Sequence, residues 1–187
     1  MSLITFDLKE IDKRMHASID AFKRELVGLR TGRAHANLLD PVHVTVYGSR
    51  MPLNQVATVS VPEPRMITVQ VWDRSNVMAV DKGIREANLG LNPITDGQVL
   101  RLPIPALTAD RRQELVKLAH KYAEQTKVAI RNVRRDAMDL LKKLEKDGKM
   151  SQDEHRGQSD KVQELTDRII KEVDQTLAAK EAEIQKV

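Results

Sequence analysis

The stretch 106–147, ALTADRRQELVKLAHKYAEQTKVAIRNVRRDAMDLLKKLEKD, runs for 42 residues without a proline or a glycine. Proline removes a backbone hydrogen-bond donor and clashes with the preceding helical turn, so a stretch of this length predicts one long helix. At 1.5 Å per residue, a helix of roughly 35–40 residues within this stretch reaches on the order of 55–60 Å. It is too long for a compact single globule, and we expect an elongated molecule.

The placement of proline divides the rest of the chain. All seven prolines lie between Pro41 and Pro105. Both ends are therefore predicted to be helical, with strands and turns between them. The sequence predicts an α+β protein in which an elongated three-helix bundle carries a small inserted β/α/β domain. The predicted divisions are residues 1–30 plus 106–187 for the bundle and residues 31–105 for the insert. The chain passes between these two predicted domains twice, which makes the junction a candidate hinge.

Apolar residues recur at helical spacing in each predicted helix. The first stripe is Ile11, Met15, Ile19, Phe22, Leu26 and Leu29, with Asp7 and Glu10 as a capping pair and Gly32 as the C-terminal cap. The second is Leu115, Leu118, Tyr122, Thr126, Ala129, Val133, Ala137, Leu140 and Leu144, ended by Gly148. The third is Val162, Leu165, Ile169, Val173 and Leu177, opened by a capping box at 151–154. Three helices with one apolar stripe each predict a three-helix bundle.

Positive charge is concentrated on the second predicted helix. The chain has a net charge of +4 and a pI near 9.3, whereas residues 111–135 alone carry eight Lys/Arg against two Glu. The basic stripe, which follows a period near 3.6, consists of Lys117, Lys121, Lys127, Arg131 and Arg135, with Arg134 on its flank. Leu115 lies about 200° from Lys117, so the stripe faces away from the bundle core. A helix whose charged residues serve only solubility normally carries both acidic and basic side chains. The excess of basic residues here predicts a face that binds a polyanion. The alternative is a solvated outer face without a partner.

The proline-containing segment is predicted to form short strands, turns and one helix. The predicted strands are 42–47, 55–61, 65–71 and 98–102, and the helix is 76–87, capped at Ser75 and closed by Gly90. Gly83 lowers the stability of this helix by about 1 kcal/mol relative to alanine, so its tertiary packing must compensate. Trp72 is predicted to be a core residue rather than a base-stacking platform, because no second aromatic residue accompanies it, as an RNA-recognition sheet requires.

The sequence carries no catalytic or metal-binding signature. It has no cysteine, its five histidines lack metal-ligand spacing, and there is no phosphate-binding loop, dinucleotide fingerprint or nucleophile elbow. We therefore expect no enzyme activity, no cofactor and no metal. The absence of cysteine fits a reducing compartment, and the N-terminal MSLITFDLKEIDKR lacks the apolar run of a signal peptide or membrane span. We expect a cytoplasmic, monomeric protein without membrane association.

Several motifs resemble those of ribosome recycling factors. They are LRTGRA at 29–34 followed by LLD at 38–40, LGLNP at 89–93, Leu107-Thr108 with Arg111-Arg112, KVAIRNVRRD at 127–136, Thr166-Asp167 and Lys180-Glu181. They follow one another in order and register over nearly the whole chain, as chance matches do not. The resemblance implies an L-shaped, two-domain protein with dimensions like those of transfer RNA. It also implies binding between the subunits of the bacterial ribosome after peptide release.

The resemblance further implies partners and sites. With elongation factor G, which supplies GTP hydrolysis, such a factor separates the post-termination complex into subunits and releases messenger RNA and deacylated transfer RNA. The implied contacts to large-subunit ribosomal RNA fall on Arg131, Arg134 and Arg135, with Arg30 and Arg33 near the junction. The basic stripe adds Lys117, Lys121 and Lys127 to the candidate RNA-binding residues. The implied hinges are Arg30, Thr31, Gly32, Arg33 and Ala34 in one crossing and Pro103, Ile104, Pro105 and Ala106 in the other. His35-Ala36 departs from the family pattern, in which a small polar residue and a proline are common, and this leaves the backbone freer.

Two other functions stay open on the sequence alone. A sequence-independent RNA-binding protein would bind any structured RNA comparably, whereas a recycling factor requires a preference for vacant or post-termination ribosomes. A helical scaffold or chaperone would need an exposed apolar groove, and the predicted stripes are already used by the bundle. An enzyme is the weakest alternative, because no catalytic motif is present.

Overall fold

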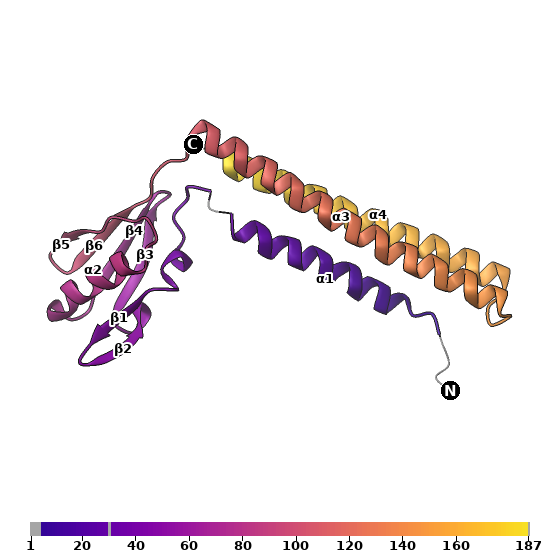
Figure 1. Ribbon diagram of the computed structural model, residues 1–187, viewed down its shortest axis with the longest axis horizontal. Helices are drawn as coiled ribbons and strands as arrows, with labels where there is room; N and C mark the ends of the chain where they lie inside the picture. The colour runs from indigo at the N-terminus through magenta and orange to yellow at the C-terminus, as the bar shows by residue number, and fades with distance from the viewer. Residues whose placement is uncertain (1–4, 30, 187) are drawn as a thin grey trace. The chain divides into compact units, whose positions relative to one another are not determined.

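The protein consists of two compact units, which are described separately. The structure is a computed structural model that describes residues 5–29 and 31–186 (Figure 1). One unit comprises Met1–Thr31 and Ala109–Val187, and the other comprises Gly32–Thr108. The prediction of an α+β protein with a three-helix bundle and an inserted unit is confirmed. In the described part of the chain, no helix is long and apolar enough to cross a membrane.

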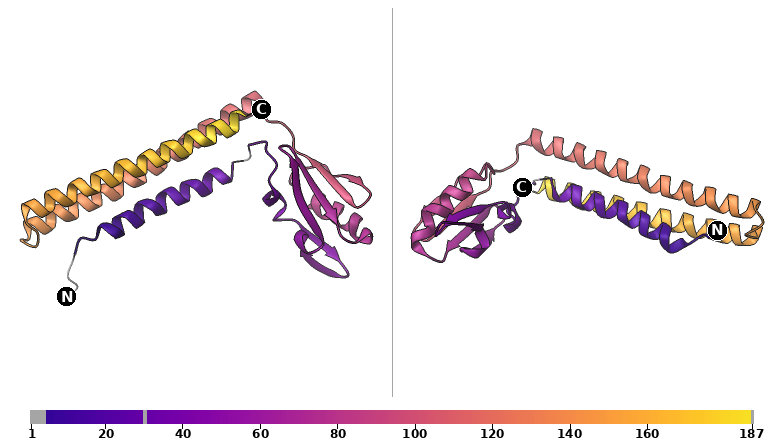
Figure 2. Two further views of the ribbon diagram at one scale, coloured as in Figure 1. Left: turned by 180° about the vertical axis from the view of Figure 1, so that it is seen from behind. Right: turned by 60° about the horizontal axis from the view of Figure 1, so that its bottom comes forward.

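The helical unit is built from three long helices. They are α1 (Leu8–Val27), α3 (Ala109–Lys146) and α4 (Gln152–Gln185), and each of them contacts the other two (Figures 1 and 2). α3 has 38 residues, which corresponds to about 57 Å. The predicted stripes of α1 and α4 are buried as expected, and Met15 and Phe22 at the centre of α1 have no exposed surface.

The core face of α3 is rotated from the predicted stripe. Its buried residues are Leu115, Ala119, Ala123, Thr126, Ile130, Val133, Ala137, Leu141 and Leu144. The prediction selected Leu118, Tyr122, Ala129 and Leu140, which are half-buried at the sides of this face. Ala119 and Ala123 are fully buried, and side chains this small at a contact let helices approach closely. At each of the four positions the buried residue is the next one along the chain, and in two cases it is an alanine that stands beside a larger side chain, Leu118 or Tyr122.

Local signals set most of the helix ends. Ser151 and Glu154 form the predicted capping box, with reciprocal side-chain-to-backbone hydrogen bonds of 2.9 and 3.1 Å. Gly148 has a φ of +70°, and the Lys149 N–H donates to the Leu144 carbonyl, so α3 ends in a Schellman motif. The prediction that Gly32 caps α1 is wrong, because α1 ends four residues earlier at Gly28.

The inserted unit contains six strands and one α-helix. They are β1 (His43–Val46), β2 (Ser49–Pro52), β3 (Ala57–Glu63), β4 (Met66–Val71), α2 (Val77–Glu86), β5 (Ile94–Asp96) and β6 (Val99–Pro103). β1 and β2 form a hairpin, and the other strands form an antiparallel sheet in the order β3-β4-β6-β5. The sequence prediction lacked β2 and β5, which are too short and too polar to show alternation. The prediction that Ser75 caps α2 is wrong, because the N-cap of α2 is Asn76, which makes no side-chain cap hydrogen bond. Asp73 instead caps the 3-10 helix Arg74–Asn76 just before α2 by accepting from the Ser75 N–H.

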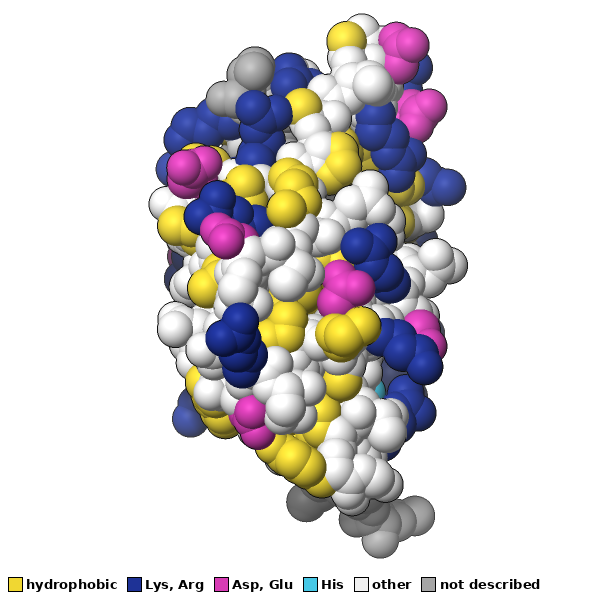
Figure 3. Space-filling model, turned by 90° about the vertical axis from the view of Figure 1, so that its left-hand side faces the viewer, with side chains coloured by type: hydrophobic (Ala, Val, Ile, Leu, Met, Phe, Trp, Pro, Cys, Tyr) yellow, Lys and Arg dark blue, Asp and Glu magenta, His cyan; other side chains and the backbone are white. Residues whose placement is uncertain are grey.

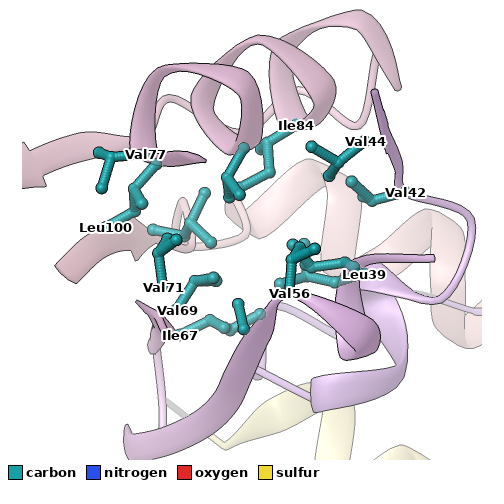
Figure 4. Packing of buried hydrophobic residues seen from close by; sticks show 14 of the residues in the cluster. Leu39, Val42, Val44, Val56, Ile67, Val69, Val71, Val77, Ile84 and Leu100 are labelled. Carbon is teal, nitrogen blue, oxygen red and sulfur yellow. The ribbon is translucent and has the colours of Figure 1, made fainter. Parts of the chain in front are cut away.

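The core of the inserted unit lies between α2 and the strands. Side chains from both sides meet there (Figure 4): Val80 and Ile84 of α2, Val44 of β1, Ile67, Val69 and Val71 of β4, and Leu100 and Leu102 of β6. Alternation along β4 sends Ile67, Val69 and Val71 inward and places Trp72 on the open side, where it is 59% exposed. The prediction that Trp72 is a core residue is therefore wrong. Its indole Nε1–H donates to the Thr58 hydroxyl across the sheet at 2.8 Å.

Gly83 marks a close approach between α2 and β1. A Cβ atom at this position would lie 2.8 Å from the His43 carbonyl oxygen and 3.2 Å from Val44 Cγ2. The backbone oxygen cannot move aside without disturbing β1, so a side chain here would separate the helix from the strand. Because Gly83 has no side chain, α2 can pack closely against β1. This packing compensates for the low helix propensity of glycine.

We expect Gly83→Ala to lower the free energy of unfolding by about 1–3 kcal/mol, because the added methyl group overpacks this contact. Gly157→Ala is the matched control, since Gly157 lies in α4 with nothing within 4 Å of the added Cβ. There the helix propensity of alanine should raise stability by up to about 1 kcal/mol. Chemical denaturation of both variants measures whether each substitution lowers or raises the free energy of unfolding. A Gly83→Ala protein as stable as the wild type would contradict the close contact.

Candidate nucleic-acid interface

Four residues of the predicted basic stripe lie together on the exposed surface of α3. They are Lys117, Lys121, Arg131 and Arg135. At 100° per residue, all four point within about 40° of a common direction around the helix axis. None of them forms an ion pair with any residue that the structure describes, and Arg135 donates instead to the Asn132 side chain at 2.9 Å. The exposed side chain of Val128 lies at the centre of the same face. We call these four cations the exposed basic face.

Lys127 does not share that face, contrary to the prediction. Its position is rotated by about 80° from that of Lys117, toward α4. Its ammonium group lies 2.6 Å from Asp174 Oδ1 and 3.3 Å from Glu124 Oε1, and its side chain is only 15% exposed. The hydrogen bond that Lys127 donates to Asp174 is the main cause of the raised pKa of Lys127. Lys127 therefore joins α3 to α4, and its charge is already balanced.

Arg134 lies on the same flank as Lys127 but meets a different partner. Its guanidinium Nε–H donates to the Gln163 Oε1 of α4 at 2.7 Å, and its side chain is half-buried. Gln163 carries no charge, so Arg134 keeps its full positive charge beside the exposed basic face. Arg134 makes no ion pair within residues 5–29 and 31–186.

The remaining basic candidates lie near the crossings. Arg33 belongs to the inserted unit and is exposed, whereas Arg30 lies outside the described residues. On the face of the molecule in Figure 3, Lys and Arg side chains are scattered among Asp, Glu and hydrophobic side chains, without the segregation that α3 shows in sequence. Among the described residues, no three His, Asp or Glu side chains converge as metal ligands would.

The first crossing is anchored at both of its ends. Thr31 is buried, and its hydroxyl donates to Glu183 Oε1 of α4 at 2.9 Å, which fixes it to the helical unit. The Ala34 N–H donates to the Pro64 carbonyl at 2.7 Å, which fixes it to the inserted unit. Between these anchors Gly32 has a φ of +73°, a conformation that favours glycine. Only Gly32 and Arg33 lie between these two anchors.

The second crossing leaves the inserted unit after β6. The Ile104 N–H donates to the Arg65 carbonyl at 2.8 Å, and α3 begins at Ala109. Pro105 and Ala106 between them are exposed. Leu107 packs against Gly32, where a Cβ atom would lie 3.1 Å from its Cγ. The two crossings therefore touch each other at Gly32, where an added side chain would crowd Leu107.

The fold and surface define a class: a two-unit α+β protein whose helical bundle presents a cationic helix. Comparison with known proteins gives the family. The model of the family described as Ribosome recycling factor matches residues 22–184. The ribosome-recycling factor of Rhizobium etli (strain CIAT 652) is 61% identical over 181 residues, which are 97% of each chain. That of Agrobacterium fabrum (strain C58 / ATCC 33970) is 62% identical and covers 97% of this chain and 98% of the relative.

Solved structures agree with the sequence relatives. The solution structure of a ribosome recycling factor superposes with a TM-score of 0.71 at 43% identity, over 96% of this chain and 95% of the other. A second structure is described as models of the T. thermophilus ribosome recycling factor and the E. coli elongation factor G bound to the E. coli post-termination complex. It superposes with a TM-score of 0.58 at 44% identity, over 95% of this chain and 96% of the other. The chain belongs to the ribosome recycling factor family.

A proline at position 36 tests the backbone of the first crossing. Ala36 is the first residue of a short 3-10 helix, Ala36–Leu39, and His35 before it is extended, with φ −134° and ψ 137°. Both features suit proline, whose missing N–H is not needed at a first helical position. We expect Ala36→Pro to raise the free energy of unfolding by about 0.4–1 kcal/mol by restricting the unfolded chain. Asn37→Pro, which forces Ala36 out of its helical conformation, is the destabilising control. A lower thermal midpoint for Ala36→Pro would contradict the local geometry.

Proposed function

We propose that this protein acts, with elongation factor G and GTP, to separate the post-termination ribosome into subunits and to free messenger RNA and deacylated transfer RNA. Membership of the ribosome recycling factor family supports this function. So does the related structure whose description places such a factor and elongation factor G on a post-termination complex. The observation that carries the proposal is the exposed basic face of α3, whose four cations have no acidic partner in the described structure.

The exposed basic face provides the anchor on ribosomal RNA. Lys117, Lys121, Arg131 and Arg135, with Arg134 at their side, contact phosphates of the large subunit. Each contact releases condensed counterions, which gives affinity without requiring a particular base sequence. The guanidinium groups also present paired N–H donors that match two phosphate oxygens. A long helix braced by two others holds these groups at fixed spacing, so they bind as a set.

The inserted unit provides the moving part and faces the translocase. The crossings at residues 30–34 and 103–106 act as hinges, and the bundle stays anchored while the insert is displaced. The sequence has no phosphate-binding loop, so the energy for this motion comes from GTP hydrolysis by elongation factor G. The protein acts in the cytoplasm as a monomer, without a cofactor or metal of its own.

The RNA contact is tested by Arg131→Ala. Arg131 is exposed, so its removal should leave the fold intact while weakening binding to isolated large ribosomal subunits by about tenfold or more. The plot of log affinity against log salt should also become shallower by about one unit, because one phosphate contact is lost. Arg168→Ala removes an exposed arginine from α4 and is the matched control. Equal salt slopes for wild type and Arg131→Ala would exclude a phosphate contact by this side chain.

The splitting activity is tested on purified post-termination ribosomes by light scattering. We expect dissociation into subunits when this protein, elongation factor G and GTP are present together, and none when any one is left out. A general RNA-binding protein, the alternative left open by the sequence, would bind an unrelated structured RNA as tightly as a ribosome and would split nothing. That result would overturn the proposed function.

A further inference from the structure

We propose that Gln163 and Asp167 of α4 are positioning residues, which hold the Arg134 guanidinium in the orientation that grips a phosphate. This inference rests on the proposed RNA contact of the basic helix. The Arg134 Nε–H donates to Gln163 Oε1 at 2.7 Å, and Gln163 Nε2 donates to Asp167 Oδ1 at 2.9 Å. The three side chains form a relay that runs from α3 across to α4 and then along α4.

The Arg134 guanidinium and the Asp167 carboxylate together fix the orientation of the Gln163 side-chain amide. A guanidinium nitrogen only donates hydrogen bonds, and a carboxylate only accepts them. The Gln163 amide must therefore turn its oxygen to Arg134 and its nitrogen to Asp167, and it cannot flip without losing both hydrogen bonds. Gln163 is half-buried, so the loss would not be fully replaced by water. The relay gives Arg134 a partner with one defined direction.

The relay leaves the useful part of the guanidinium available. Nε is occupied, but the two terminal nitrogens carry four further N–H groups in a rigid plane. Two parallel donors of that kind match two oxygens of a phosphate. Because the plane is already oriented, less side-chain freedom is lost on binding, and the affinity gain is larger than that of a free arginine.

A comparison with Lys127 shows why the partner is an amide. Lys127 and Arg134 lie on the same flank of α3, about 20° apart around the helix axis, and both reach α4. Lys127 meets the carboxylate of Asp174 at 2.6 Å, so its charge is balanced within the protein. Arg134 meets the neutral Gln163, which orients the guanidinium without balancing its charge. The carboxylate in this second case, that of Asp167, accepts a hydrogen bond from Gln163 and forms no ion pair with Arg134.

Two substitutions at position 163 separate orientation from charge. Gln163→Met keeps the length of the side chain and its helix propensity but removes the acceptor, so Arg134 is no longer oriented. Gln163→Glu keeps an acceptor but adds a charge that balances Arg134, as Asp174 does for Lys127. We expect both variants to bind large subunits about threefold to tenfold more weakly than the wild type. Gln175→Met is the matched control: it makes the same change at an exposed glutamine of α4 outside the relay, so its affinity should stay within twofold of the wild type.

The decisive experiment is a double-mutant cycle of Arg134→Ala and Gln163→Met, read as the affinity of the full-length protein for isolated large ribosomal subunits. We expect Gln163→Met to weaken binding in the wild-type background and to have no effect in the Arg134→Ala background. A merely structural role of Gln163 would weaken binding equally in both backgrounds, and that result would overturn the inference. Thermal midpoints of all four proteins show whether the fold is unchanged.

The same cycle separates this inference from the proposed function. If Arg134→Ala binds as tightly as the wild type, Arg134 makes no phosphate contact, and both the contact and its positioning fail. If Arg134→Ala weakens binding and Gln163→Met does not, the RNA contact stands and the positioning role alone is wrong. Orientation is supported when the two substitutions together cost no more affinity than Arg134→Ala alone.

Discussion

The burial of α1 against both α3 and α4 is the interaction on which the rest of the molecule depends. α1 and α3 are separated in sequence by the whole inserted unit, so their packing closes the chain around Gly32–Thr108. Ion pairs strengthen this closure, because Arg14 contacts Asp136 of α3 and Lys23 contacts Glu172 of α4, each at 2.9 Å. The C-terminal end of α4 also holds Thr31 through Glu183. The bundle therefore fixes where the first crossing begins, as well as the direction of the basic helix.

The proposed RNA binding depends on which cations of α3 have their charge balanced by acidic side chains of α4. The flank of α3 that faces α4 carries two cations, and α4 balances the charge of Lys127 while it only orients Arg134. The cations on the exposed basic face have no such partners in the described structure. α4 carries nine Asp/Glu against five Lys/Arg, yet it does not neutralise the positive charge of α3 as a whole. Lys127 is paired with Asp174 and stabilises the bundle, whereas Arg134 and the exposed basic face stay available to RNA phosphates.

Local patterns in the sequence were sufficient for most of the fold and for part of the site. The stripes of α1 and α4, the capping box at Ser151 and the inserted strands β3, β4 and β6 depend on spacing and turn chemistry, which are visible in the sequence. The wrong prediction for the core face of α3 depended on long-range contacts. The face of α3 is set by two neighbouring helices, so the buried alanines could not be identified from one helix alone. Lys127 and Trp72 were misplaced although the sequence carried the signal: Lys127 lies about 80° from Lys117 around the helix axis, and Trp72 directly follows the inward-facing Val71 at the end of β4. Gln163 gave no signal except its spacing of four residues from Asp167.

The claim that α3 turns its basic face toward ribosomal RNA can be tested most directly by tethered-iron cleavage, because the chain has no cysteine of its own. A single cysteine replaces either Val128, at the centre of the exposed basic face and 52% exposed, or Gln175, which is exposed on α4. Each is labelled with an iron chelate, and hydroxyl-radical cleavage of large-subunit RNA is mapped in the complex. We expect strong, localised cleavage from position 128 and weak or no cleavage from position 175. Cleavage that is equal from both positions, or stronger from position 175, would contradict the account.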